Sequence, residues 1–141
     1  LNLWDCASKP TKKDIENRDD IIVLVNTFYD KVRPDETIGY FFSKTVQVNW
    51  EKHLPVMYNF WENIIFHVGS YSGNPMKHHI SLHQKSPMKK EHFNRWIQLF
   101  NETVDEMFEG EHAEQAKQRA LSIATVMQIN IAQLPNQESI Y

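Results

Sequence analysis

The sequence has little of what usually cross-links or interrupts a small protein. It contains one cysteine, Cys6, which excludes an intramolecular disulfide framework and fits a reducing compartment. Only four glycines and six prolines occur in 141 residues, and they fall between segments with the periodicity of helices. No strand pattern competes with that periodicity, and no internal repeat is present. We therefore expect an all-α fold.

Long apolar runs and blocks of one charge are missing as well. No run is long enough to span a bilayer, and no signal peptide is visible. The formal net charge is −3, without a basic block or stripe, which argues against nucleic acid as a partner. These absences favour a soluble, cytoplasmic domain that acts without a membrane or a nucleic acid. We also expect a monomer.

Aromatic residues, by contrast, are abundant: eight Phe, five Tyr and four Trp. Such side chains either fill a core or line a pocket, and composition alone favours the core. The length suits one domain. We expect a flexible N-terminal arm over residues 1–13, a folded domain over 14–135 and a tail over 136–141.

Four substantial helices are predicted from the spacing of apolar residues. The first is either continuous or divided near Asn17 into a short and a long helix, and Pro34 stops it. The third is expected to have Ser86 as its cap and Pro87 in its first turn. The predicted helices cover residues of about 14–33, 49–67, 87–109 and 111–132.

The stretch GNPMKHHISLH, residues 73–83, puts three histidines within six residues. His79 and His83 are four apart and would share one face of a helix, a spacing that can suit zinc. However, no H-E-x-x-H motif is present, and Cys6 is too isolated to supply a thiolate. The lack of C-x-x-C-H excludes covalent attachment of c-type haem. A histidine taken at random is seldom a ligand, so surface positions remain the commoner interpretation.

Three of the predicted helices each carry one hydrogen-bonding group in an otherwise apolar stripe. These groups are Tyr29, His53 and Trp96. One such residue is more often a satisfied core residue than a functional one. Three of them, together with a ligand-type histidine elsewhere, suggest a pocket for a large apolar group that binds something small and polar.

Five segments in order resemble the group III truncated haemoglobins. They are FYDKVRPDETIGYFF, WEKHLPVMYNFW, YSGNPMKHHISLH, HFNRWIQLFNETVDEMF and QRALSIATVMQ, and the resemblance covers roughly residues 15–132. It implies a shortened globin fold in which two helices pack over two around haem b. It also implies that His79, four residues after Pro75, is the iron ligand, with His78 and His83 as the other choices.

The resemblance also implies the residues of the haem pocket. Its tyrosine falls on Tyr29, its distal histidine on His53 and its tryptophan on Trp96. Met57 stands where a smaller branched residue would also fit the family pattern. The full predicted pocket comprises Phe28, Tyr29, Phe42, His53, Met57, Phe60 and Trp96. Candidate partners for the haem propionates are Lys52, Lys77, His78 and Arg95.

The function implied is binding of dioxygen, nitric oxide or another diatomic ligand at the iron, as a carrier or a sensor. A second hypothesis is an enzyme that removes nitric oxide or peroxide. Because the chain has no flavin or NAD segment, such an enzyme would need an external reductase. A third hypothesis is a helical interaction module or a zinc protein without haem.

Overall fold

The computed structural model describes residues 12–41, 49–67 and 88–132, and these form four helices without a strand. The predicted all-α fold is confirmed. The arm expected over residues 1–13 and the tail over 136–141 lie almost wholly outside the described residues. The helices are α2 (Arg18–Val32), α3 (Trp50–Phe66), α5 (Lys90–Met107) and α6 (Glu111–Ala132).

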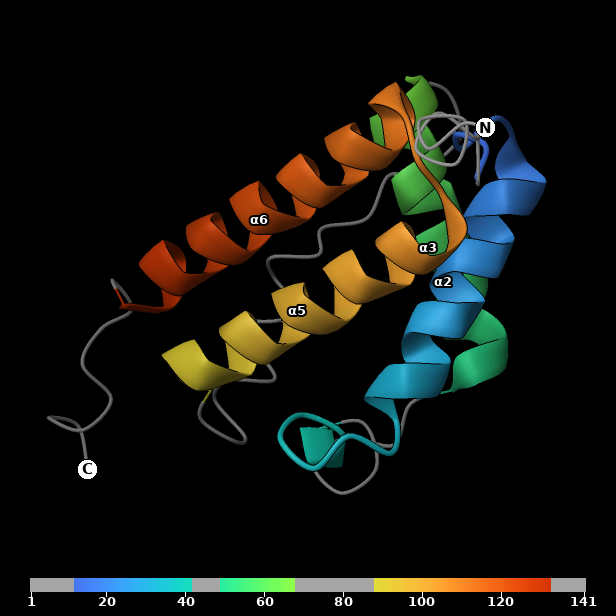
Figure 1. Ribbon diagram of the computed structural model, residues 1–141. Coiled ribbons are helices and arrows are strands. Elements are labelled where there is room, and N and C mark those ends of the chain that lie inside the picture. The colour runs from blue at the N-terminus through green and yellow to red at the C-terminus, as the bar shows by residue number, and fades with distance from the viewer. Residues whose placement is uncertain (1–11, 42–48, 68–87, 133–141) are drawn as a thin grey trace, which may run out of the picture.

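The four helices pack in two pairs. Helices α5 and α6 run side by side in opposite directions, and α2 packs against α3 (Figure 1). The pairs meet because α2 also packs against α5, and α3 against α6. This is the two-over-two arrangement predicted from the sequence. It brings the second half of α2 next to the middle of α5, where Phe28 contacts Trp96 and Phe100.

Helix α2 begins at its predicted cap. The Asn17 side chain accepts the Asp20 backbone N–H at 3.0 Å, and acidic Asp19 and Asp20 lie in the first turn, where the helix dipole favours them. Residues 12–16 are not helical. Both predicted forms of this region, a continuous helix from about residue 14 and a short helix before Asn17, were therefore wrong. The helix begins after Asn17 because the Asn17 side chain caps it.

Helix α3 matches its prediction within a residue at each end. The Asn49 side chain caps its start by accepting the Lys52 backbone N–H, and His67 ends it in a left-handed conformation with φ of 59°. The helix continues through Pro55. Proline in the second turn removes one hydrogen bond but does not end a helix whose apolar face is held by packing.

Helix α5 begins later than predicted, at Lys90 rather than near Pro87. Lys89 is extended, and its backbone N–H donates to Nδ1 of His92 at 2.8 Å, so a histidine three residues inside the helix holds the start. Burial lowers the pKa of His92, which favours the neutral ring that can accept this bond. The predicted cap Ser86 lies outside the described residues.

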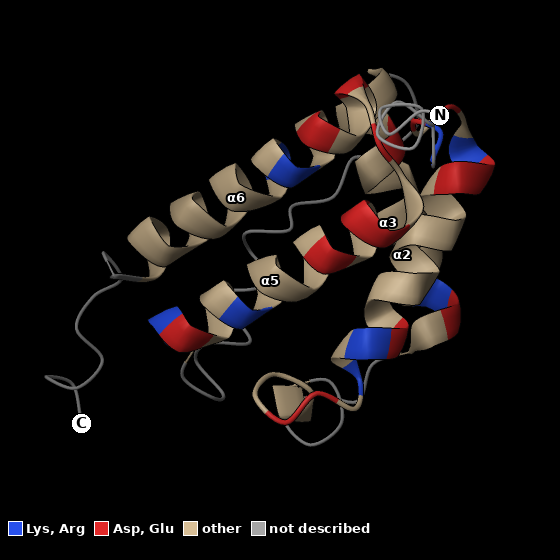
Figure 2. Cartoon of the chain, in the orientation of Figure 1, with Lys and Arg blue, Asp and Glu red and all other residues tan. Residues whose placement is uncertain are grey.

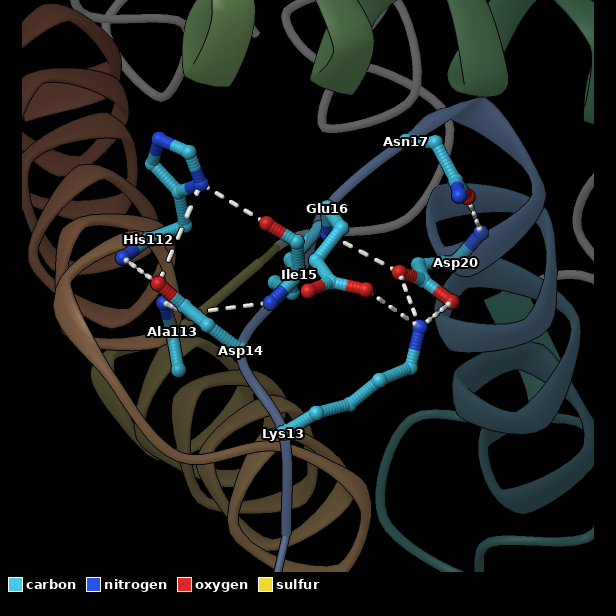
Figure 3. A network of polar contacts seen from close by, with 8 residues as sticks. All are labelled: Lys13, Asp14, Ile15, Glu16, Asn17, Asp20, His112 and Ala113. Carbon is cyan, nitrogen blue, oxygen red and sulfur yellow. Dashed lines mark hydrogen bonds and ion pairs between the residues drawn. The ribbon is translucent and has the colours of Figure 1, made fainter.

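The segment before α2 ties that helix to the start of α6, as the close view in Figure 3 shows. The Asp14 carboxylate accepts the backbone N–H groups of His112 and Ala113, each at 2.9 Å. In return, the His112 ring donates from Nδ1 to the Ile15 carbonyl at 2.7 Å. Asp14 therefore caps a helix that begins nearly a hundred residues further along the chain.

The same segment is also bound to α2. The Asp20 carboxylate accepts the Lys13 ammonium at 2.7 and 2.8 Å and the Glu16 backbone N–H at 2.8 Å (Figure 3). Charged residues of both signs are spread over α2, α3 and α5, whereas the second half of α6 carries none (Figure 2). That uncharged half contributes Ala124 and Met127 to the core.

Candidate functional site

Tyr29 and His53 face each other where α2 packs against α3. The phenol oxygen and the imidazole Nε2 are 3.3 Å apart, a hydrogen bond in which the donor depends on the imidazole tautomer. Tyr29 is only 7% exposed. Its burial raises the pKa of the phenol, so the hydroxyl keeps its proton. We call these two residues the Tyr29–His53 pair.

Aromatic rings from α2 and α5 lie beside this pair. Phe28 makes edge-to-face contacts with Trp96, at 5.8 Å between centroids, and with Phe100, at 5.3 Å. Trp96 lies nearly parallel to Phe100, with 13° between their planes. Trp96 is half-buried, in contrast to Phe100, which has no exposed surface. Two of the predicted pocket residues, Phe28 and Trp96, are therefore in contact.

Two more predicted residues lie along the face of α3 that carries His53. Met57 is half-buried against the core, and Phe60 is 9% exposed. Their spacing from His53, four and seven residues, keeps them on one side of the helix. Phe60 also contacts the ring of Trp61 edge to face. The face thus changes from polar at His53 to apolar at Phe60.

Trp50 belongs to the same group of rings, although it was not among the predicted pocket residues. Its ring contacts Tyr29, with centroids 5.1 Å apart, and His53, at 5.6 Å. The Arg33 guanidinium lies over that ring, 3.9 Å from the centroid. The available signal was the three-residue spacing between Trp50 and His53, which places both on one face of α3.

The apolar core of the described residues forms two clusters instead of one. The larger cluster joins all four helices, and a smaller one contains Phe93, Ala124 and Met127. Half-buried Trp96 and Ile123 contact both clusters. A smaller cluster beside the main core is common, so the division alone does not indicate a ligand. The fit to haem rests on the lining instead: Phe28, Met57 and Phe60 are apolar, and Trp96 is half-buried. With them lie two hydrogen-bonding groups, those of Tyr29 and His53. The side chains of the site therefore fit haem on the face that the structure describes.

Several predicted residues lie outside the described part of the chain. They are Phe42, Lys77, His78, His79 and His83. Within residues 12–41, 49–67 and 88–132, no group of three or more His, Cys, Asp or Glu could hold a metal ion. Of the propionate candidates, Lys52 is exposed on α3. Arg95 binds Asp35, through Nε at 2.8 Å and Nη2 at 2.7 Å.

The helix pairing and the contact of buried Tyr29 with half-buried His53 are those of a globin-like protein, and the comparisons agree. The family model of the bacterial-like globins matches residues 14–131. The group 3 truncated hemoglobin ctb of Campylobacter jejuni is 32% identical over 115 residues, which cover 79% of this chain and 88% of that protein. The chain therefore belongs to the bacterial-like globins, a haem-binding family, and within it to the group III truncated haemoglobins.

The fold comparison gives the same answer. The crystal structure of the group III truncated hemoglobin from Campylobacter jejuni is similar, with a TM-score of 0.76 at 29% identity, and the match covers 90% of this chain and 100% of that one. Among the described helices, none is long and apolar enough to cross a membrane.

Proposed function

We propose that this chain binds haem b between the α2–α3 pair and the α5–α6 pair, and that the site takes dioxygen and other diatomic ligands. Haem b supplies an iron atom with one coordination position open to such a ligand. His79 is the proposed iron ligand on one side, with His78 and His83 as the alternatives to be tested. The observation that carries the proposal is the hydrogen-bonded contact of buried Tyr29 with half-buried His53 among aromatic rings.

The roles of the polar residues follow from their chemistry. The Tyr29 hydroxyl stays protonated and donates a hydrogen bond to a ligand that gains negative charge. Trp96 has an indole N–H that can only donate, and His53 donates in one of its tautomers. Phe28, Phe42, Met57 and Phe60 exclude water, which strengthens these bonds.

We also propose a monomeric, cytoplasmic protein. Any redox turnover, such as the removal of nitric oxide or peroxide, would take its electrons from an external reductase, because the sequence holds no flavin or NAD segment. Nitric oxide consumption measured with and without an added reductase separates turnover from reversible binding.

The cofactor and its ligand are tested by absorption spectra. Purified protein reconstituted with haemin should give ferric, ferrous and ferrous-carbonyl spectra of a histidine-ligated haem. His79→Gly should lose that ligation, and added imidazole should restore it, whereas His78→Gly and His83→Gly should leave the spectra unchanged. If the wild-type protein stays colourless with haemin, the proposal fails in favour of a haem-free helical module or a zinc protein.

The donor role of Tyr29 is tested by comparing two gases. Tyr29→Phe should speed dioxygen release about tenfold, because one hydrogen bond to a partly charged ligand is lost. Carbon monoxide gains less charge, so its release should change by less than about twofold. The matched control is Tyr58→Phe, whose hydroxyl donates to the Asn26 side chain away from the site. Equal effects on both gases would contradict the assignment.

A further inference from the structure

Four side chains meet where the end of α2 lies against the start of α3. Tyr29 lies on α2, and Arg33, four residues later, is the C-cap of that helix with helical dihedral angles. Trp50 and His53 are three residues apart on α3. Each spacing places its two residues on one face of a helix. The two faces oppose each other, and the four side chains therefore form one contact group, which we call the Trp50 cluster.

Trp50 contacts both members of the Tyr29–His53 pair. Its ring meets Tyr29 at an interplanar angle of 62° and His53 at 76°, both edge-to-face arrangements. Tyr29 and His53 also meet edge to face, with centroids 5.5 Å apart. Each of the three rings thus touches the other two. An imidazole in such a triangle cannot rotate far without colliding with a neighbouring ring.

Arg33 holds Trp50 by a contact of a different kind. Its guanidinium is 3.9 Å from the centroid of the indole, within the range of a cation–π interaction. Arg33 is exposed, while Trp50 is half-buried and Tyr29 is buried. From solvent inward, the Arg33 guanidinium comes first, the Trp50 indole second and the Tyr29 hydroxyl last. That hydroxyl is the group to which the proposed function assigns ligand binding.

We propose that Trp50 is a positioning residue that keeps the imidazole of His53 within hydrogen-bonding distance of Tyr29, and that Arg33 keeps Trp50 in place. This inference rests on the proposed function, since it assigns to Trp50 and Arg33 the alignment of the groups that meet the diatomic ligand. Neither residue touches that ligand. Without the indole, His53 has room to turn toward solvent, and the Tyr29 hydroxyl loses its fixed orientation.

The first test uses the wild-type protein and two variants of Trp50, each with haem bound. Trp50→Leu removes the ring, whereas Trp50→Phe keeps a smaller one. We expect Trp50→Leu to release dioxygen about fivefold faster, in line with the loss of one aligned hydrogen bond. We expect one C–O stretching band in the ferrous-carbonyl form of wild type and several in that of Trp50→Leu. Trp50→Phe should restore the single band and release dioxygen at nearly the wild-type rate.

The second test concerns Arg33 and has a matched control. Arg33→Gln removes the cation above the indole, and Lys31→Gln removes a cation of the same helix that pairs with Glu106 instead. Arg33→Gln should broaden the C–O band and speed dioxygen release about twofold. Lys31→Gln should match wild type in both. Equal behaviour of the two variants would overturn the role given to Arg33.

A measurement without haem separates this inference from the proposed function. The ring nitrogens of His53, observed by NMR in the haem-free protein, should report a hydrogen bond to Tyr29 in wild type and in Trp50→Phe. That signature should be lost in Trp50→Leu and in Tyr29→Phe. If Trp50→Leu keeps it, the positioning role is wrong even when haem binds normally. If wild type binds no haem yet shows this pattern, the proposed function fails and the positioning role stands.

Discussion

The carboxylate of Asp35 illustrates how much one residue can organise. Its side chain is 6% exposed and accepts two contacts from Arg95 and the backbone N–H groups of Thr37 and Ile38. Burial alone would raise the pKa of this carboxyl group, but the hydrogen bonds outweigh it and lower the pKa. Asp35 thereby joins the turn after α2 to Arg95 in the first half of α5. Arg95 is the residue directly before Trp96.

Replacing Arg95 by glutamine should lower the free energy of unfolding by about 2 kcal/mol, because it leaves a nearly buried carboxylate without its counterion. The value is moderated by the partial exposure of Arg95 and by the two backbone donors that remain. Urea unfolding of the haem-free protein measures it. Lys31→Gln, which breaks an ion pair to the exposed Glu106, should cost less than about 1 kcal/mol. Equal losses in the two variants would contradict the argument.

The sequence could not reveal this partner of Arg95. Arg95 was considered as a propionate contact because it lies in the right segment, but Asp35 is 60 residues away in the chain. The family resemblance placed Tyr29 and His53 in one pocket. In the structure the two side chains lie within hydrogen-bonding distance. Helical spacing put Trp50 on the face of His53. The contact with Arg33 depends on how two helices meet, which spacing within one helix does not determine.

At the scale of the helices, the ends were harder to predict from the sequence than the interiors, because different interactions determine them. Apolar periodicity placed α3 and α6 almost correctly, because periodicity reports the buried face directly. Asn17 was a visible cap for α2 because its side chain acts on its own helix. The start of α5 was misplaced, since a serine followed by a proline is a common signal but a histidine that accepts the Lys89 N–H is a rare one.

The start of α6 depends on Asp14 and on Gly110. Gly110 has φ of +145°, and a Cβ there would lie 2.5 Å from Cγ of Asp14. Asp14→Ala should lower the free energy of unfolding by about 1 kcal/mol through the lost cap. Gly110→Ala should cost more, about 2 kcal/mol or above, because it adds backbone strain and a collision. Urea unfolding of each variant gives both values.

Whether the stability losses of Asp14→Ala and Gly110→Ala add up is a more specific test than either loss alone. In the double variant the contacts with Cγ and Oδ2 of Asp14 are removed, whereas the Cβ of residue 14 stays 2.7 Å from the added Cβ. Gly110→Ala should therefore cost less there than in the wild-type background, but still more than zero. Asp105→Asn, which alters an exposed carboxylate paired with Lys117, serves as a control background in which Gly110→Ala keeps its full cost. Strict additivity of Asp14→Ala and Gly110→Ala would mean that the carboxylate does not limit the space at Gly110.

At the scale of the whole molecule, three carboxylates hold separate parts of the chain together. Asp14 joins the N-terminal segment to α6, Asp20 joins it to α2, and Asp35 joins the turn after α2 to α5. In each case burial would raise the pKa, and hydrogen bonds from side-chain or backbone donors lower it overall. A single chemical change, the binding of protons, therefore acts on three junctions at once.

The sign of the resulting pH dependence follows from linkage. A carboxyl group whose pKa is lower in the folded state than in the unfolded state stabilises the fold above its unfolded value, near 4, and that contribution is lost as the pH falls through the folded value. We therefore expect the stability contributed by Asp14, Asp20 and Asp35 to be complete at neutral pH and to disappear below about pH 4.

The difference in the free energy of unfolding between wild type and each variant should therefore depend on pH. Asp35→Asn should lower the free energy of unfolding by about 2 kcal/mol at pH 7. Asp14→Asn should lower it by about 0.5 kcal/mol, because the amide oxygen still accepts one backbone N–H but the negative charge at the start of α6 is lost. Both differences should shrink toward zero below pH ~4, where the protonated wild-type carboxyl resembles the amide. Urea unfolding of the haem-free proteins between pH 7 and 3, followed by circular dichroism, measures them without a contribution from cofactor loss. As a control, Asp105→Asn should differ little from wild type at every pH. A constant loss of stability for Asp35→Asn across this range would show that ionisation of Asp35 does not stabilise the fold.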